Sequence, residues 1–238
     1  MSSNKATVVV GVGPGLGAAV SRRFAREGFS VGLMARTAAA CEAVQREIEG
    51  AGGRALSVPG DATDAASVAA AFARVEESLG PVEVLIYNAS VFRVAGALEL
   101  TPRELEDDWK INCLGGFLSA QAALPGMLQR GRGTILFTGA TASLRGGARF
   151  AALAVGKAGL RALAQSLARE LGPRGIHVAH VVIDGLIDTP RVRAMMPGRT
   201  AATLLSPEAL AETYFQLHAQ APSAWTLEID VRPSEEKF

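Results

Sequence analysis

Residues 8–20 read VVVGVGPGLGAAV, and this stretch decides the fold that we expect for the chain. A strand-like run of valines passes through a glycine cluster into a segment with helical periodicity. Gly11 would make the tight turn, Gly15 would let the backbone approach a phosphate, and Gly17 would allow the helix to pack closely on the strand. The helix N-terminus would offer its free N–H groups to that phosphate. The stretch predicts a dinucleotide-binding turn, and a glycine-rich turn without a ligand is the alternative.

The rest of the chain repeats this alternation of strands and helices. Strand candidates fall at 6–11, 29–35, 54–60, 82–88, 133–139, 177–183 and 224–231, and helix candidates near 15–27, 37–51, 64–79, 101–130 and 147–172. The strands are nearly continuous apolar runs, as a parallel sheet buried on both faces requires. Alternation at this spacing is typical of right-handed βαβ crossovers. The sequence predicts an α/β fold, a single doubly wound Rossmann-type parallel sheet with helices on both faces, in one domain spanning residues 1–238.

Two helix starts carry capping signals. Thr101-Pro102-Arg103-Glu104 places a capping threonine before a proline at the first helical position, with a glutamate at the third. Ser206-Pro207-Glu208 repeats the first two of these features. We therefore expect helices to begin at Pro102 and Pro207.

The composition limits the partners of the protein. The formal charge is +1 over 238 residues, and lysine and arginine are scattered along the chain. Nucleic acid and anionic membranes need a concentrated basic face, so neither is expected as a partner. No apolar run approaches the roughly 20 residues that a membrane span requires, and the N-terminus lacks the layout of a signal peptide. We expect a cytoplasmic protein that acts on a small molecule.

The cysteines and histidines give no sign of a metal centre. Cys41 and Cys113 are isolated and have no paired spacing, which is typical of a reducing compartment. His177, His180 and His218 do not complete a ligand set with them. His177 and His180 lie in a predicted strand, where a histidine is more often a packing residue than a catalyst. The sequence predicts no metal site.

The end of the second predicted strand indicates which dinucleotide would bind. An NAD site usually places an acidic residue there, where it binds the ribose 2′-OH. The stretch LMARTA instead has Arg36 and no carboxylate. A guanidinium suits a 2′-phosphate by its charge and its planar fork. The sequence therefore favours NADP(H) over NAD(H), although Arg36 as a plain surface residue remains the alternative.

A single charge interrupts the stretch RFAALAVGKAGL at 149–160. At helical spacing, Lys157 lies on the border between a buried stripe and a solvated one. One interpretation is a lysine whose stem covers apolar surface while its ammonium group reaches water. The other is a functional lysine, and the pattern alone does not separate the two.

With these residues assembled, the chain resembles the short-chain dehydrogenase/reductase family over essentially its whole length. Gly11, Gly15 and Gly17 match the family's glycine motif. Asn112 matches its active-site asparagine, and Lys157 matches the lysine that holds the nicotinamide ribose hydroxyls. The further matches are Asp61, which would meet the adenine ring, the turn Tyr87-Asn88-Ala89-Ser90, and the loop Gly185-Leu186-Ile187-Asp188-Thr189-Pro190, whose Ile and Thr would bind the carboxamide.

The resemblance implies an oxidoreductase of small molecules and, with the glycine turn and Arg36, a set of cofactor residues. The expected set is Gly11, Gly13, Gly15, Leu16, Gly17, Arg36, Asp61, Ala62, Asn88, Ala89, Lys157, Gly185, Ile187 and Thr189. Small residues on the two long helices suit close packing. In the family these helices form the interface of a dimer, so the resemblance also implies a homodimer or homotetramer.

The acid–base half of the family's motif is missing. The family's tyrosine lies four residues before the lysine, where this chain has Leu153, and its serine falls on Ala140. Neither side chain can donate a proton or stabilise an oxyanion. A tyrosine seven residues before the lysine is also absent, because Phe150 is there, and Asp184 replaces the proline before Gly185. The chain resembles a divergent subgroup that lacks the active-site tyrosine.

Two hypotheses about function remain open. The first is an NADP(H)-dependent oxidoreductase of a carbonyl or alcohol with an atypical proton path, in which Asn112 and Lys157 serve the site and Thr141, Ser143 or Asp184 replaces the missing acid. Thr138 and Lys157 itself are further candidates. The second is a catalytically inactive NADP(H)-binding sensor or assembly protein. The segment between Thr189 and Ser206, with Met195, Met196 and Leu204, would form an apolar lid.

Overall fold

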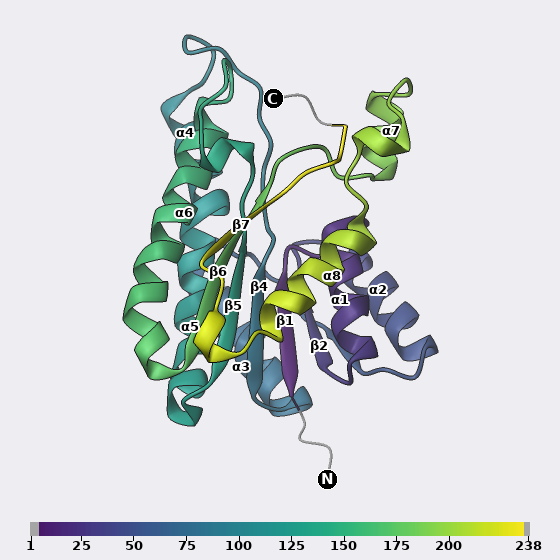
Figure 1. The fold of residues 1–238 in the computed structure, drawn as a ribbon, viewed down its shortest axis with the longest axis vertical. Coiled ribbons are helices and arrows are strands. Elements are labelled where there is room, and N and C mark those ends of the chain that lie inside the picture. The colour runs from purple at the N-terminus through teal and green to yellow at the C-terminus, as the bar shows by residue number, and fades with distance from the viewer. Residues whose placement is uncertain (1–4, 236–238) are drawn as a thin grey trace.

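The computed structural model describes residues 5–235, which build a seven-stranded sheet with every neighbouring pair parallel (Figure 1). The strand order is β3-β2-β1-β4-β5-β6-β7. The strands are β1 (Ala6–Val10), β2 (Ser30–Met34), β3 (Ala55–Ser57), β4 (Val82–Tyr87), β5 (Gly133–Thr138), β6 (Ile176–Ile183) and β7 (Glu228–Val231). The predicted doubly wound parallel sheet is confirmed.

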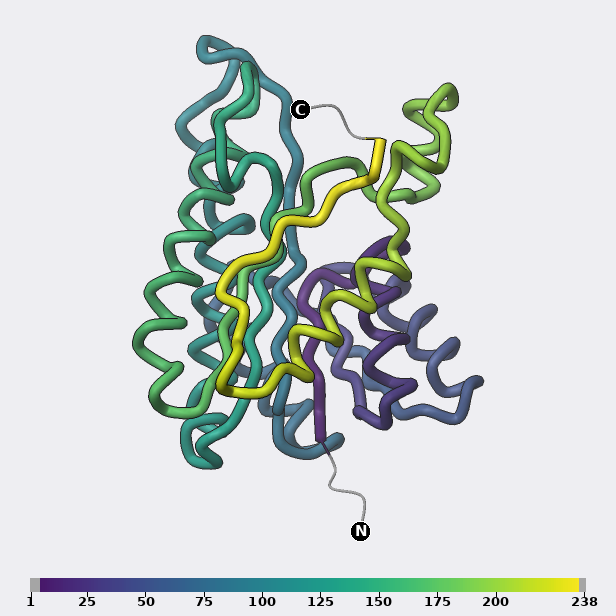
Figure 2. The backbone as a smooth tube through the Cα atoms, in the orientation of Figure 1, coloured from purple at the N-terminus to yellow at the C-terminus, as the bar shows by residue number. Residues whose placement is uncertain are grey.

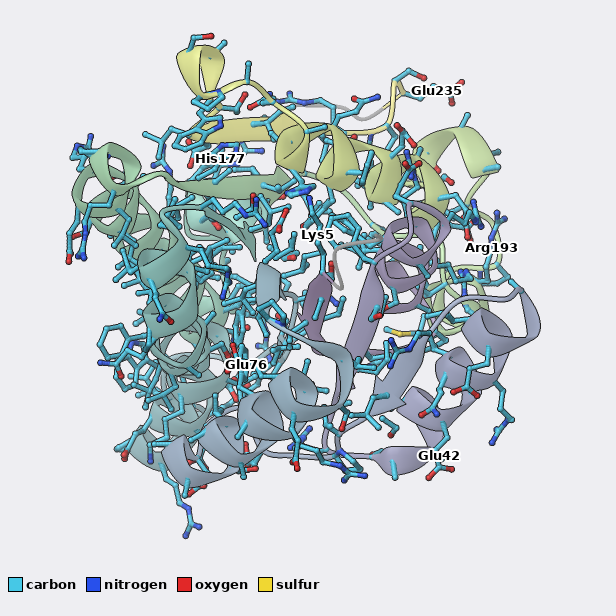
Figure 3. The ribbon with its side chains drawn as sticks, turned by 90° about the horizontal axis from the view of Figure 1, so that it is seen from below. Lys5, Glu42, Glu76, His177, Arg193 and Glu235 are labelled. Carbon is cyan, nitrogen blue, oxygen red and sulfur yellow. The ribbon has the colours of Figure 1, made fainter. Side chains whose placement is uncertain are left out.

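Helices cover both faces of the sheet and give it two hydrophobic cores. One core lies under α1 (Leu16–Arg26), α2 (Ala38–Gly50) and α8 (Pro207–His218). The other lies under α3 (Ala65–Leu79), α5 (Gly115–Arg130) and α6 (Ala151–Leu171). Figure 3 looks onto the edge where the strands begin, with Lys5 just before β1. Burial of both faces explains why the strands are continuous apolar runs.

The remaining elements gather at the opposite edge of the sheet. There α4 (Pro102–Trp109) leads through a π-helical turn (Lys110–Leu114) into α5, and α7 (Pro190–Met195) stands above α8 (Figure 1). The chain after β7 rises to this same edge (Figure 2). Ligands of doubly wound sheets bind outside the carboxyl ends of the strands. The candidate site is therefore sought at this edge.

Several predicted boundaries change in the structure. The third strand is shorter than 54–60 because Pro59 and Gly60 follow directly after Val58. The last strand begins only at Glu228, since residues 222–224 form a 3₁₀ turn. Helix α6 begins at Ala151 because Arg149 adopts a left-handed φ of 68°. The sequence analysis did not predict α7.

Both predicted helix caps are present. The Thr101 side chain accepts a hydrogen bond from the Glu104 N–H, and the Glu104 carboxylate accepts one from the Thr101 N–H. Ser206 accepts a hydrogen bond from the Ala209 N–H in the same way. These bonds satisfy N–H groups that have no partner within the helix, so both helices start where the sequence predicts.

One helix of the described chain, Pro102–Arg130, has the length and apolar composition of a membrane span. No such run is evident in the sequence, because polar residues interrupt the first half of this helix. Its apolar residues Ala120, Ala123 and Met127 are buried in the core beneath α5. Packing of this helix on the sheet therefore accounts for its apolar composition.

Candidate cofactor and active site

The turn after β1 requires glycine at its first position. Gly11 has a φ of 95°, and a Cβ atom there would lie 2.3 Å from the backbone nitrogen of Ala89. The Gly11 N–H donates to the Met34 carbonyl at 2.8 Å, and the Asn88 side chain donates to the Gly11 carbonyl at 2.9 Å. The turn is thus tied to the ends of β2 and β4. Only glycine combines this φ with so close a backbone approach.

Of the other glycines in the turn, Gly17 and Gly15 lie close to neighbouring groups, whereas Gly13 does not. A Cβ atom on Gly17 would lie 2.6 Å from the Gly11 carbonyl oxygen, so glycine is needed for close packing of helix on strand. A Cβ atom on Gly15 would lie 2.7 Å from Cγ2 of Thr189, which brings the loop after β6 onto the turn. Gly13 faces open space, and Leu16 is buried. Within residues 5–235 no side chain caps the start of α1, and the Ala18 N–H donates to the Gly13 carbonyl, so the N–H groups before Ala18 are left for a ligand.

A cavity of about 320 Å³ opens beside this turn. Six of the predicted cofactor residues line it: Gly11, Arg36, Asp61, Ala62, Asn88 and Ala89. Thr63 donates to the Asp61 carboxylate from its N–H and its hydroxyl, both at 2.8 Å, and these bonds, with the charge of Arg36, lower the pKa of Asp61. These bonds hold the Asp61 carboxylate in one orientation, where it acts as a hydrogen-bond acceptor. The glycine cradle, the free N–H groups and Arg36 fit a dinucleotide that carries a 2′-phosphate.

Lys157 is buried deeper than its helical position predicts. Its side chain lies on the inner face of α6 with 2% of the residue exposed, so the border interpretation is wrong. The ammonium group donates to the Thr138 carbonyl at 2.8 Å, and burial lowers the pKa of Lys157 to about 8. Burial disfavours the charged form of an amine. Burying the ammonium group at the end of β5 costs free energy of folding, and a role in ligand binding would explain why a lysine stands there.

Asn112 lies in the π-helical turn, and its side chain is fully used. Its Oδ1 accepts bonds from the Ser90 hydroxyl and the Val91 N–H, and its Nδ2 donates to the Val91 carbonyl. The same turn frees the Ile111 carbonyl, which accepts a bond from the Tyr87 hydroxyl at 2.5 Å. These roles of Ser90 and Tyr87 were not predicted. Both residues stand in the turn after β4, where their difference from the family's Asn-Ala-Gly pattern could have marked them.

Tyr87→Phe is expected to destabilise the protein by about 1 kcal/mol, because it leaves the partly buried Ile111 carbonyl without its donor. The phenyl ring keeps the packing of a side chain that is fully buried. Urea unfolding measures the change. An unchanged free energy of unfolding would mean that this bond does not hold the π-helical turn.

The structure sorts the candidates for the missing acid. Thr141 follows β5 and Asp184 follows β6, and the Thr141 hydroxyl donates to Oδ1 of Asp184 at 2.5 Å. The Ser143 hydroxyl accepts from the Ala140 N–H at 3.1 Å, and the Thr138 hydroxyl is paired with that of Tyr214 at 2.7 Å. Thr141 and Asp184 are therefore brought together, whereas Thr138 is occupied inside the core.

Residues from the C-terminal segment close over Asp184. The Asp184 N–H donates to the Val231 carbonyl at 2.9 Å, and Arg232 lies 3.9 Å from the carboxylate. Pro233 is buried against Gly185, where a Cβ atom would meet its ring at 2.9 Å. Asp184 is only 8% exposed. The C-terminal segment thus shields the Asp184 carboxylate from solvent and places the Arg232 guanidinium beside it.

The predicted lid is an excursion tied at its base. Ile187 and Leu205 form an isolated parallel bridge, with the Asp188 N–H donating to the Leu205 carbonyl at 2.8 Å. Met195 and Met196 are exposed as a lid would require, but Leu204 is buried beside the bridge and belongs to the core. The lid surface is therefore smaller than the sequence predicts.

The chain is similar to proteins of known structure and name. A family model described as short chain dehydrogenase matches residues 5–200. A short-chain dehydrogenase from Rhodopseudomonas palustris is 40% identical, with a TM-score of 0.85 over 97% of this chain and 99% of that one. A metagenomic short-chain oxidoreductase in complex with NADP is 30% identical, with a TM-score of 0.85 over 98% and 99%. An inactive 2-(S)-hydroxypropyl-CoM dehydrogenase 2 from Xanthobacter autotrophicus is 35% identical over 81% of this chain and 82% of its own length.

These similarities agree with the molecule itself. The matched family model covers the glycine turn and the first six strands of the parallel sheet. The chain belongs to the short-chain dehydrogenase family.

Proposed function

We propose that this protein is an NADP(H)-dependent oxidoreductase that interconverts a carbonyl and an alcohol on a small molecule through a proton path of its own. The observation that carries the proposal is the hydrogen bond between Thr141 and Asp184 at the edge of the sheet where the cofactor cleft opens. Thr141 directly follows Ala140, where the family's serine is missing, and Asp184 is bonded to Thr141. An acid–base pair therefore stands beside a site that has lost its usual one.

The cofactor assignment has support from both ends of the cleft. The glycine turn presents the uncapped start of α1, and Arg36 lines the cavity beside Asp61. The related metagenomic oxidoreductase was crystallised with NADP. NADPH bound in this cleft would supply a hydride, which is the chemistry of the cofactor. Lys157 would hold the ribose hydroxyls, as the resemblance implies.

The proton path follows from the direction of the bond. Thr141 donates its proton to Asp184, so its own lone pairs are free to accept a proton from a substrate hydroxyl. In alcohol oxidation the substrate O–H proton passes to Thr141 and the Thr141 proton passes to Asp184. In carbonyl reduction the same two protons move in reverse, from a protonated Asp184 through Thr141 to the substrate oxygen.

The test removes each member of the pair. Thr141→Val and Asp184→Asn are each expected to lower kcat by about 10²–10⁴-fold, because general acid–base catalysis contributes that much. The affinity for NADPH, measured by fluorescence titration with NADH as the comparison, should remain that of the parent. Thr134→Val, at the other end of β5, is the matched control for loss of a threonine hydroxyl and should leave turnover unchanged. Full activity in both site variants would refute the path.

The second candidate function is an inactive NADP(H)-binding protein. Its support is the 35% identity to a dehydrogenase whose name calls it inactive, together with Leu153 in place of the tyrosine. Tight NADPH binding with no oxidation of NADPH across a panel of aldehydes and ketones would favour this candidate over the first.

We also propose that the protein acts in the cytoplasm as a homodimer or homotetramer. Large apolar side chains stand exposed on neighbouring helices of one side of the molecule, namely Trp109 on α4, Phe117 on α5 and Val155 on α6 (Figure 1). Sedimentation velocity would measure the state of association.

A further inference from the structure

A polar cluster built around a buried histidine lies near the end of β5, and the proposed function does not use it. His180 on β6 is 1% exposed, and its Nδ1 lies 2.9 Å from Oε2 of Glu228 on β7. Arg161, one helical turn after Lys157, donates to both oxygens of Glu228 at 2.7 Å. The cluster therefore connects the inner face of α6 with the last two strands.

Glu228 fixes the tautomer of His180. The hydrogen bonds from Arg161 lower the pKa of Glu228, so this side chain is a carboxylate and can only accept. Burial lowers the pKa of His180 to about 4, so the imidazole is neutral. A neutral ring carries one N–H, and the carboxylate requires it on Nδ1. The Nε2 atom is left as a bare lone pair, and within residues 5–235 it has no hydrogen-bond partner.

The bare nitrogen is directed at the end of β5. A Cβ atom on Gly139 would lie 2.3 Å from Nε2 of His180, and 3.0 Å from the hydroxyl oxygen of Ser143. Gly139 is thus the residue that makes room for the ring, one position before Ala140. Lys157 donates to the carbonyl of the preceding residue, Thr138, and its positive charge contributes to the low pKa of His180. The lone pair and the ammonium group therefore both lie at the end of β5, beside the consecutive residues Gly139 and Thr138.

We propose that His180 is a positioning residue for Lys157: Glu228 holds the imidazole as the Nδ1–H tautomer, and the bare Nε2 lone pair keeps the neighbouring ammonium group charged in the buried site. The lone-pair side of a neutral imidazole is the negative end of its dipole, which attracts a cation. The opposite tautomer would turn an N–H towards that cation. Low local dielectric strengthens both effects.

The groups that face Lys157 from the surrounding elements support this role. β5 contributes the neutral carbonyl of Thr138, and β6 contributes His180. On β7, Glu228 stands behind the ring of His180 and is neutralised by Arg161 from the same helix as Lys157. Among these groups, the imidazole is the one whose dipole next to the ammonium group can be reversed, by a change of tautomer.

The consequence for function rests on the proposed NADP(H) site, where a charged Lys157 would hold the cofactor. The test is made on the cofactor-free protein, so the two can fail separately. Nitrogen NMR of the full chain labelled at histidine and lysine reports the tautomer of His180 and the titration of Lys157. His180→Leu and Lys157→Arg assign the two signals. We expect a bare Nε2 on His180 in the parent protein.

Glu228→Gln is the decisive variant. The amide can donate to Nδ1, so the ring should switch to the Nε2–H tautomer and the titration midpoint of Lys157 should fall by about one pH unit. His180→Leu removes the lone pair and should lower the midpoint as well, which keeps the test available if the first variant does not fold. Arg161→Met is the matched control, because it breaks the ion pair with Glu228 but keeps the carboxylate, and the tautomer should stay.

Two results would overturn the proposal. One is a bare Nδ1 in the parent protein, and the other is an unchanged Lys157 midpoint in both Glu228→Gln and His180→Leu. If the tautomer and the midpoint behave as expected and NADPH does not bind, the positioning role stands and the proposed function fails.

Discussion

Lys157→Met is expected to raise the free energy of unfolding at pH 7 by up to about 3 kcal/mol while abolishing tight NADPH binding. The residue is fully buried, and its pKa falls from 10.5 in the unfolded chain to about 8 in the folded one. Each unit of such a shift corresponds to about 1.4 kcal/mol of penalty on the charged form. Methionine has a similar length and no charge, so it removes this penalty. Loss of the bond to the Thr138 carbonyl reduces the gain.

The pH dependence identifies the cause. Below about pH 8 the lysine is protonated in both the folded and the unfolded chain, so the penalty is fully present. Between pH 8 and 10.5 the unfolded chain holds more protons on this residue, so the stability of the parent rises towards that of the variant. Urea unfolding of both proteins at pH 7 and pH 10 measures this convergence. The buried thiols of Cys41 and Cys113 titrate equally in both proteins, and their contributions cancel.

A variant that is less stable than the parent at pH 7 would contradict this account. It would mean that the bond to Thr138 and the lone pair of His180 stabilise the ammonium group by more than burial costs. Lys157→Arg is the control, because it keeps a charge in the same place. Since a larger cation must enter the same buried space, we expect it to lower stability rather than raise it.

The double substitution Leu153→Tyr with Ala140→Ser is expected to raise carbonyl reduction by about 10²-fold or more. Leu153 lies one turn before Lys157 on α6 and is 7% exposed. Ala140 follows β5 directly before Thr141. The pair would restore the proton donor and the hydroxyl that the family uses, and an acid in position contributes about 10²–10⁴-fold. The measurement is NADPH oxidation with a panel of simple aldehydes and ketones.

The single variants are the controls for this experiment. Ala140→Ser alone adds a hydroxyl without the proton donor and should give little gain. If the double variant binds NADPH as the parent does and shows no gain with any carbonyl, the substrate site has diverged by more than these two residues. A gain that persists when Thr141→Val is added would show that the restored tyrosine works without the path through Asp184.

Much of the fold could be predicted because its signals are local. The strands are apolar runs, the caps at Thr101 and Ser206 are single side chains, and Gly11 and Gly17 are dictated by backbone approach. The cavity lined by Arg36 and Asp61 opens beside the same turn, and the assignment of individual residues to the cofactor stays a prediction.

The pairing of Thr141 with Asp184 could not be predicted because it depends on a contact between distant residues. Thr141 and Asp184 are 43 residues apart, and each has an ordinary structural explanation in the sequence. The depth of Lys157 depends on which face of α6 meets the sheet, and helical spacing leaves it on a border. The π-helical turn around Asn112 is held by Tyr87 from another element, so its own sequence carries no signal.

The bridge between Ile187 and Leu205 separates an exposed excursion of the chain from the sheet and the glycine turn. Because the excursion is closed at its base and Thr189 packs on the turn at Gly15, we expect insertions or deletions after Thr189 to leave both Gly185 and that turn in place. Each doubling in the length of such a loop costs only about 0.6 kcal/mol. The segment between Thr189 and Leu205 is therefore the place where evolution, or an engineer, can exchange residues at low cost in stability.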